Sequence, residues 1–497
     1  MNAAKLVLFY FWLTLVAVFV PAQNSFAATY YVDASAANDT GNGSSGSPKK
    51  YIGSGLALLS SSGGDILIVR NGTYAATNDR MTGIPNGIPS AYNVVRAEND
   101  GGAVITAADS FDVASSYVQI EGFKFSGAYN KTVSGNHIKI KRCAFVSGPS
   151  GGNNVTLDFE GSYNLIEDCW IYGAGGRYKI LMWRADHLIL RRVVIRDDGG
   201  WTSDNSDPEA GVVVYETSNV ELQNVIVIDS NLATYDNNNV GAFYVTGHAG
   251  NPPSNNVNFT GCIALNNRRA GWHNDTDDGG VGCTVTDTVI YGTESEGMGT
   301  SNTSMNITGT RITMGNVGDR FIGNWGNRSI AISNSVFWSS ANASSGTVSV
   351  TFSDAYGQND FFGSGVIHVN PLTNGLLYLP RIESASPLKT AGSGSTQAGA
   401  QILNKMGADG TLHGENGYNT LTANALWPWP NEARIKADFA SVSGGARGFA
   451  AGTSLDGSAQ TLTKYIWEYL GNTILCEIYG TCGSVTAPAA PSGLTVN

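Results

Sequence analysis

The stretch Ile120-Glu121-Gly122-Phe123-Lys124-Phe125 contains an apolar pattern that returns along the middle of the chain. The same spacing recurs, at first strictly and then more weakly, at Ile140/Cys143/Phe145, Ile166/Cys169/Ile171, Leu190/Val193/Ile195, Leu222/Val225/Val227, Phe259/Cys262/Ala264, Val285/Thr288/Ile290, Ile307/Thr310/Ile312 and Ile332/Ser335/Phe337. Successive copies are 20 to 37 residues apart. That period indicates a solenoid, in which each coil buries its apolar face against its neighbours. The sequence therefore predicts an all-β fold, a parallel β-helix with loops of variable length.

The composition agrees with a turn-rich β protein and argues against one class of partner. Charged residues make up 14% of the 497 residues, against about 25% in typical domains, and 62 residues are glycine. The net charge is -11. Because nucleic-acid binding needs a basic face, we expect no nucleic-acid partner.

Residues 1–28 read as a signal peptide. Lys5 is followed by an apolar run from Leu6 to Val20, and small residues near Ala27-Ala28 suit cleavage. A membrane anchor is the alternative, but the run has 15 residues, fewer than the roughly 20 of a spanning helix. We therefore expect a secreted protein, extracellular or at the cell surface, with no transmembrane segment in the mature chain.

The rest of the chain divides into three expected parts. Residues 29–400 form the β-helix, opened by a capping helix around Tyr51 to Leu59, and residues 401–482 form a C-terminal cap, since the edge strands of a last coil must be covered. Residues 483–497 form a linker. Cys143, Cys169 and Cys262 share one position of the pattern and are expected inside, whereas Cys476 and Cys482 are expected to form a disulfide.

Charged residues next to the pattern alternate in sign from coil to coil. Glu121, Lys141, Glu167 and Arg191 occupy one position, and stacking places equivalent residues about 4.8 Å apart. We interpret this ladder, together with Arg142, Asp168 and Arg192, as structural.

Candidate functional residues concentrate in the inserts at 197–209, 235–248 and 268–278 and in the coil before them. Loops that leave a solenoid at one phase emerge on one face. Aromatic rings can stack on sugars, and cationic side chains pair with uronate carboxylates, so a polysaccharide is the expected partner. The predicted substrate-binding residues are Arg184, Trp201, Tyr235, Tyr244, Arg269 and Trp272.

Proton abstraction beside a uronate carboxylate needs a base and a neutralised carboxylate. The predicted catalytic residues are Lys179, Arg268 and His273, and the predicted metal ligands are Asp275, Asp277 and Asp278. Their carboxylate oxygens suit Ca²⁺, which is the expected cofactor. Asp197/Asp198 and Asp277/Asp278 could instead serve a glycoside hydrolase. Neither His248 nor His273 has a Ser or Cys arrangement that suggests a catalytic triad.

Two segments resemble exported right-handed parallel β-helix proteins of the pectate-lyase-like superfamily. The first comprises Tyr30 to Asp33, Ser47-Pro48 and Gly64 to Tyr74, and the second runs from Gly261 to Thr288. The resemblance implies a right-handed solenoid and a polysaccharide substrate. The chain departs from those lyases in the segment Val240 to Gly247, which lacks their base Lys, so Lys179 or Arg268 would have to replace it. Residues Val485 to Asn497 resemble the start of a fibronectin type III module.

These observations favour a secreted carbohydrate-active protein, with a lyase acting on uronate-containing glycans as the first hypothesis. The alternative is a non-catalytic cell-surface or matrix protein that binds polysaccharide or acts as a rigid adhesin-like stalk. The missing Lys and the C-terminal resemblance favour the alternative, whereas the concentrated aromatic and charged inserts favour the lyase.

Overall fold

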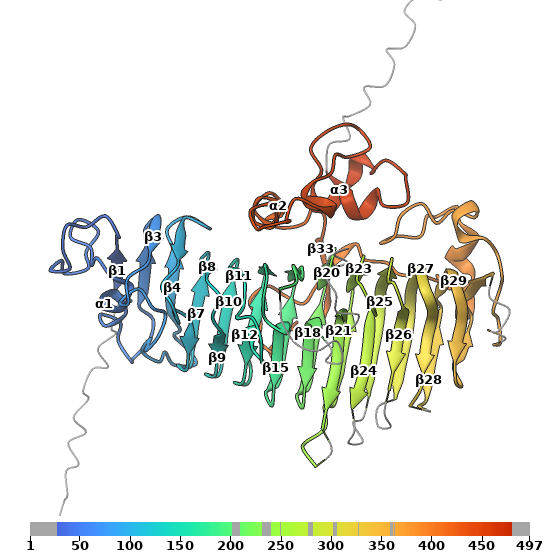
Figure 1. Cartoon of the computed structure of the whole chain (residues 1–497), viewed down its shortest axis with the longest axis horizontal. Helices are drawn as coiled ribbons and strands as arrows, with labels where there is room; N and C mark the ends of the chain where they lie inside the picture. The colour runs from blue at the N-terminus through green and yellow to red at the C-terminus, as the bar shows by residue number, and fades with distance from the viewer. Residues whose placement is uncertain are drawn as a thin grey trace, which may run out of the picture.

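The computed structural model describes residues 27–479 except 201–208, 231–239, 249, 277–281, 302–305, 327, 358–360 and 362. The chain forms a right-handed parallel β-helix, as the sequence predicts, and its 31 solenoid strands stack coil upon coil (Figure 1). Three strand positions per coil build three long parallel sheets, because each strand pairs with the equivalent strand of the next coil.

The first sheet begins at the N-terminus and runs the whole length of the solenoid. Its strands are β1 (Thr29–Val32), β2 (Ile66–Val69), β4 (Asn93–Ala97), β7 (Val118–Glu121), β10 (Ile138–Lys141), β13 (Leu165–Glu167), β16 (Asp186–Arg191), β19 (Ser218–Gln223), β22 (Val257–Thr260), the first parts of β25 (Cys283–Tyr291) and β27 (Ile307–Asn324), β28 (Ile330–Ser333) and β30 (Ser349–Thr351).

The second sheet follows the first after a tight corner in every coil. Its strands are β3 (Gly72–Tyr74), β5 (Ala103–Ile105), β8 (Lys124–Ser126), β11 (Ala144–Val146), β14 (Trp170–Tyr172), β17 (Val194–Ile195), β20 (Ile226–Ile228), β23 (Ile263–Leu265), later parts of β25 and β27, the start of β29 (Val336–Ser345) and β31 (Asp354–Tyr356).

The third sheet completes each coil. Its strands are β6 (Asp112–Val113), β9 (Lys131–Val133), β12 (Val155–Phe159), β15 (Tyr178–Trp183), β18 (Glu209–Tyr215), β21 (Val240–Gly247), β24 (Trp272–Thr276), β26 (Glu296–Thr300) and the ends of β27 and β29.

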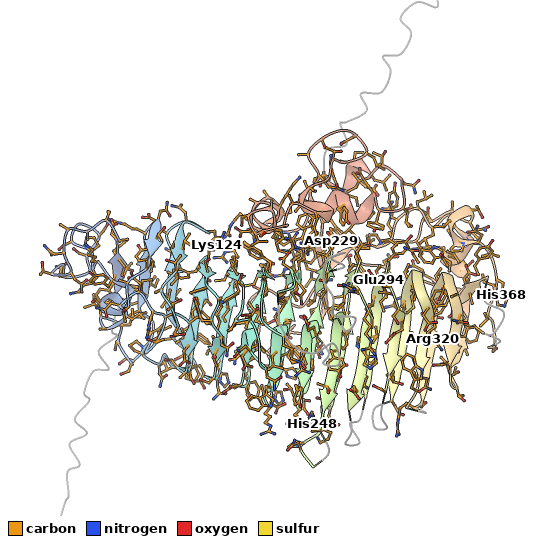
Figure 2. The ribbon with its side chains drawn as sticks, in the orientation of Figure 1. Lys124, Asp229, His248, Glu294, Arg320 and His368 are labelled. Carbon is orange, nitrogen blue, oxygen red and sulfur yellow. The ribbon has the colours of Figure 1, made fainter. Side chains whose placement is uncertain are left out.

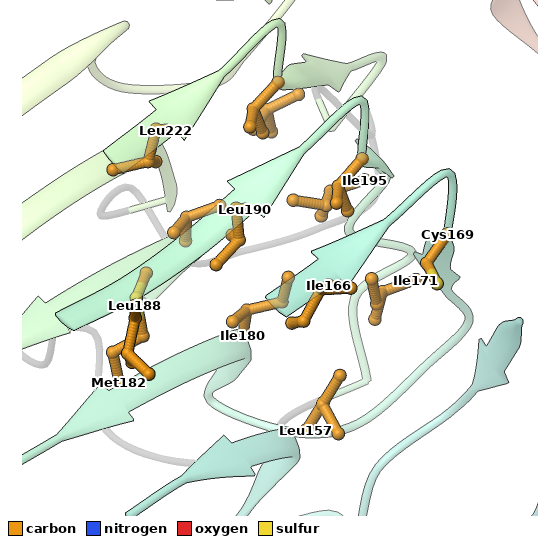
Figure 3. Close-up of a cluster of buried hydrophobic side chains, with 14 of the residues drawn as sticks. Leu157, Ile166, Cys169, Ile171, Ile180, Met182, Leu188, Leu190, Ile195 and Leu222 are labelled. Carbon is orange, nitrogen blue, oxygen red and sulfur yellow. The ribbon is translucent and has the colours of Figure 1, made fainter. Parts of the chain in front are cut away.

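The repeating apolar pattern is the corner between the first and second sheets. Its first apolar residue is the last but one of a first-sheet strand, and the residue two positions later takes a left-handed conformation, which turns the chain. Gly122, Arg142, Asp168, Arg192, Asn224 and Gly261 all have φ between 52° and 77°. Apolar residues on both sides of this corner then face the interior, where Ile166, Cys169 and Ile171 pack with their counterparts from adjacent coils (Figure 3).

The predicted interior cysteines and the charge ladder are both confirmed. Cys143, Cys169 and Cys262 are buried and free. Glu167 lies between Lys141 at 3.1 Å and Arg191 at 3.0 Å, and Arg192 lies 2.6 Å from Asp168. Cys476 is disulfide-bonded, and Cys482, its predicted partner, lies outside the described residues.

A helix caps the N-terminal end of the solenoid, whereas the C-terminal region lies along one of its sides. Helix α1 (Ile52–Leu56) buries Ile52 and Leu56 against the first coil, as expected of a capping helix. Residues 371–479 run along the outside of the second sheet, whereas we expected the C-terminal region to cover the last coil (Figure 1). The C-terminal region covers the second sheet because the outer face of that sheet is apolar. Trp170, Ile226 and Trp338 are buried beneath this region.

The C-terminal covering region contains short elements joined by loops. These are η1 (Pro371–Thr373), η2 (Pro387–Thr390), η3 (Ser393–Ser395), β32 (Asn404–Met406), β33 (Leu421–Ala425), α2 (Glu432–Ala440), η4 (Gly448–Ala450), α3 (Leu462–Trp467) and η5 (Cys476–Ile478). In the described part of the chain, no helix is both long and apolar enough to cross a membrane. Residues 1–26 of the expected signal peptide (1–28) and the whole of the expected linker (483–497) lie outside that part.

Candidate active site on the outer face of the third sheet

The outer face of the third sheet lies on the side of the loop that carries His248 (Figure 2). Parallel pairing lines up two outward rows across the coils. One row contains Leu181, Val213, Tyr244, His273 and Gly299, and the other contains Trp183, Tyr215, Thr246 and Asp275. Side chains far apart in the sequence therefore become neighbours about 4.8 Å apart.

Four polar side chains from three coils meet in these rows around His273. Its Nε2 lies 3.0 Å from the hydroxyl of Ser301, and its Nδ1 lies 3.4 Å from Oε1 of Glu296. The Tyr244 ring stacks on the imidazole with centroids 5.6 Å apart, and its hydroxyl donates a 2.8 Å hydrogen bond to Asp275. His273 is 8% exposed and Glu296 2% exposed, so both are buried, the imidazole slightly less than the carboxylate.

The electrostatics give these groups different protonation states. Burial, with the charge of Asp275 second, raises the pKa of Tyr244 well above its ordinary value, so the phenol keeps its proton at neutral pH. Burial also raises the pKa of Glu296, but His273, the Ser295 hydroxyl and Arg269 more than offset this and hold it below the ordinary value. The cluster thus combines a proton donor with an imidazole beside a carboxylate, the combination used in general acid–base chemistry.

Glycine at position 299 makes room for the imidazole. A Cβ there would lie 2.5 Å from Nδ1 of His273 and 3.1 Å from Oε1 of Glu296. Any larger residue would displace both groups, so the backbone of β26 is part of the site.

Arginines flank the cluster and the strands before it. Nε of Arg269 lies 3.6 Å from Glu296, and Nε of Arg268 lies 3.9 Å from Glu294. Arg184, three coils toward the N-terminus from His273, pairs with Glu216 at 2.6 Å. Each of Arg184, Arg268 and Arg269 thus has an acidic neighbour, and their predicted roles, substrate binding for Arg184 and Arg269 and catalysis for Arg268, stay predictions.

A pocket of about 360 Å³ opens on the same face, beside the N-terminal end of the cluster. Trp183, Arg184, Tyr215, Glu216, His248 and Asp158 are among the residues that line it. Oδ1 of Asp158 is buried and has no hydrogen-bond partner. Burial and the charge of Glu160 raise the pKa of Asp158 to about 7.

Two predicted site residues turn out to lie in the interior. Lys179 is fully buried, 3.1 Å from Asp197, and donates a hydrogen bond to the carbonyl of Gly175. Trp272 is 1% exposed and packs in the main core. We therefore leave both out of the site. Trp201, Tyr235, Asp277 and Asp278 lie outside the described residues.

Sequence reasoning missed Glu296, Ser301 and Asp158. The first two follow a weak copy of the pattern, and the number of residues between pattern and third-sheet strand changes from coil to coil. Only the strand register of β24 and β26 shows that His273 lies opposite Gly299, between Glu296 and Ser301. A serine partner for His273, which we did not expect, is therefore a finding of the structure.

The described residues do not decide whether the predicted metal site exists. Within the described ranges, no group of three or more His, Cys, Asp and Glu side chains is placed to hold an ion. Two of the three expected ligands, Asp277 and Asp278, are outside those ranges, so Ca²⁺ binding stays a prediction.

Comparisons with known proteins give likenesses of fold only. No family model matches the chain, and no curated protein matches it. Among solved structures, the pectate lyase Pel9A is 17% identical over 76% of this chain and 97% of its own, with a TM-score of 0.44. The A-module of the mannuronan C-5 epimerase AlgE6 of Azotobacter vinelandii is 10% identical over 64% and 94%, with a TM-score of 0.41.

A third solved structure, the alginate lyase of Paenibacillus sp. str. FPU-7, is 13% identical over 60% of this chain and 95% of its own, with a TM-score of 0.37. At these identities and TM-scores, the likenesses assign neither an activity nor a substrate to this chain.

Proposed function

We propose that this protein acts outside the cell on an acidic polysaccharide, and that the outer face of its third sheet cleaves the chain by β-elimination. The observation that carries the proposal is the cluster around His273. The His273 imidazole lies between the Ser301 hydroxyl and the Glu296 carboxylate and is stacked on a protonated tyrosine.

The proposed reaction assigns one role to each group. His273 takes the proton from C5 of a uronate residue, and the C5–H electron pair forms the C4=C5 double bond. The C4–O bond breaks, and Tyr244 gives its proton to the leaving oxygen. The charges of Arg268 and Arg269 favour the carboxylate of the substrate as negative charge develops at C5.

Calcium remains part of this proposal. Bound by Asp275 together with Asp277 and Asp278, Ca²⁺ would supply further positive charge beside the substrate carboxylate. The cluster itself does not depend on the ion for its arrangement, since Tyr244 already holds Asp275 by a hydrogen bond.

Ester hydrolysis is a second candidate, favoured by one specific observation. Ser301, His273 and Glu296 follow the order nucleophile, base and carboxylate of a catalytic triad, although the 3.4 Å between His273 and Glu296 is not a hydrogen bond. In that case Ser301 would attack an ester, such as an acetyl group on the polysaccharide, and His273 would transfer its proton to the leaving alcohol.

One experiment separates these functions. Purified protein is incubated with alginate, polygalacturonate and their acetylated forms, with calcium or with EDTA, and both unsaturated uronate and free acetate are measured. For a lyase, we expect His273→Ala to lower formation of unsaturated product by about 10²-fold or more, with Ser301→Ala retaining it. Tyr356→Phe, at an exposed position on β31 away from the third sheet, is the control.

Two other outcomes of this experiment would support a different function. Acetate release that Ser301→Ala abolishes would support the esterase. No product from any substrate, with protein shown to be folded by circular dichroism, would contradict both reactions and support the non-catalytic, polysaccharide-binding alternative.

A further inference from the structure

Two of the large exposed side chains are tryptophans on the outer face of the third sheet. Trp183 is 38% exposed and Trp325 is 49% exposed. Single exposed apolar residues need no explanation. Two exposed tryptophans on one face of the sheet, on either side of the His273 cluster, do call for one.

The strand register places both tryptophans in the same row. Trp183 pairs with Tyr215, Tyr215 with Thr246, and Thr246 with Asp275. The row continues through the residue after Thr300 to Trp325, whose amide donates to the Thr300 carbonyl at 2.9 Å. Five coil steps separate the two rings, or about 24 Å along the solenoid axis.

The backbone next to Trp325 accommodates its ring. A Cβ at Gly323 would lie 2.4 Å from two ring atoms, so the indole lies across a position where other residues would place a side chain. Gly323 follows Gly299 in the row that contains His273. The Arg320 guanidinium lies 5.6 Å from the ring centroid. The ring therefore lies over the continuation of the row that contains His273.

The Trp183 end is built as a pocket. Its ring shares the 360 Å³ pocket with Asp158, and the Arg184 guanidinium lies 5.2 Å from the ring centroid. Small-molecule sites in proteins range from about 300 to 1,000 Å³. The unpartnered Oδ1 of Asp158, buried in this pocket, is a polar group that a sugar hydroxyl could satisfy.

We propose that Trp183 and Trp325 are stacking platforms at the two ends of one glycan-binding groove, which takes a linear polysaccharide along the solenoid axis. The inference deepens the proposed function and rests on it in taking the ligand to be an acidic glycan. Because one extended sugar residue is close to one coil step in length, the groove holds about six residues, with the His273 cluster acting on an internal bond. The protein is then an endo-acting enzyme that needs an extended substrate.

The test measures binding and product formation separately. Affinity for oligosaccharides of increasing length, prepared from alginate and from polygalacturonate, is measured by titration calorimetry for wild type and for Trp183→Ala, Trp325→Ala and the double variant. We expect affinity to rise with length up to about six residues and then level off. Each single variant should lose about 3- to 10-fold in affinity for the longest oligosaccharides and little for the shortest. Tyr356→Ala removes an equally exposed ring outside the groove and should change nothing.

The outcomes distinguish this inference from the proposed function. Length-dependent binding that both tryptophans support, without product, would uphold the groove and overturn the catalytic proposal. Product that depends on His273, with affinity unaffected by either tryptophan, would overturn the groove and uphold the catalysis. No binding to either series of oligosaccharides would overturn the groove for acidic glycans.

Discussion

At the scale of single residues, Gly299 decides where the His273 imidazole can lie. Gly299→Ala would place a methyl group 2.5 Å from Nδ1 of His273, so we expect the imidazole to move and product formation to fall at least 10-fold. The backbone tolerates alanine, because Gly299 is not in the left-handed region. Turnover on the best substrate of the panel is the measurement.

The control for this change is Gly241→Ala on β21. Its Cβ would meet only atoms at 3.6 and 4.0 Å, an ordinary contact, so activity and melting temperature should stay near wild type. Equal losses in both variants would contradict a specific role for the space at position 299.

Glu167 is the residue on which the charge ladder depends. Burial raises its pKa, but Arg192, Lys141, the Gly410 amide and Arg191 outweigh burial and leave the pKa below the ordinary value of 4.5. Glu167→Gln would leave buried Arg191 without its carboxylate partner, whereas Arg192 keeps Asp168 and Asp409, and we expect a loss of about 3–5 kcal/mol in unfolding free energy at pH 7.

The lowered pKa also gives a pH dependence. Because the folded-state pKa is lowered, the stabilisation is fully present above pH 4.5 and disappears as the pH falls through the folded-state value. Denaturant unfolding at pH 7 and at about pH 3 should therefore show a smaller difference between Glu167→Gln and wild type in acid. Glu121→Gln, at the more exposed pair with Arg142, should cost about 1 kcal/mol or less at either pH. A pH-independent effect of Glu167→Gln would contradict the assignment.

At the scale of elements, Asp229 fastens the C-terminal covering region to the solenoid. Its carboxylate accepts hydrogen bonds from Asn266, from the Phe449 amide at 3.0 Å and from the Tyr465 hydroxyl at 2.9 Å. Asp229→Ala would leave the buried Phe449 amide without its acceptor, at about 1–3 kcal/mol, and would remove two part-buried hydrogen bonds, so residues 448–470 should loosen. Hydrogen exchange of that segment is the measurement.

A charge within the covering region provides the comparison. Asp456 is exposed and pairs only locally in sequence, with Lys464 eight residues away, so Asp456→Ala should leave exchange of the segment close to wild type. If Asp229→Ala also leaves it unchanged, the covering region is held by its apolar contacts alone.

At the scale of the whole molecule, the covering region makes the solenoid unequal along its length. The apolar cluster beneath it extends from Ala144 to Trp338 and, in the described part of the chain, includes no earlier residue. Stability in a solenoid is approximately a sum over coils and their interfaces, so the first coils have fewer stabilising contacts. We expect amides of β2 and β4 to exchange at lower denaturant concentrations than those of β14 and β20. Exchange measured by mass spectrometry checks this, and one common transition for all coils would contradict it.

The β-helix and its ladders follow from the sequence because they depend on short-range spacing. The corner uses residues within six positions of one another, so Ile166, Cys169 and Ile171 predict their own burial. Glu167 and Arg191 sit at equivalent positions of successive copies, which is enough to predict their pairing.

The site needed the tertiary structure because third-sheet strands follow the corner at irregular distances. Inward and outward side chains also do not simply alternate along the third-sheet strands, since the consecutive residues Ala242 and Phe243 both pack inside. Lys179 suggested a base in the sequence but faces inward to Asp197, whereas Glu296 and Ser301 reach His273 only through the register of β24 and β26. The sequence by itself therefore determined the coil, while stacking decided which polar residues share a face, because loop length sets the register and local spacing does not encode it.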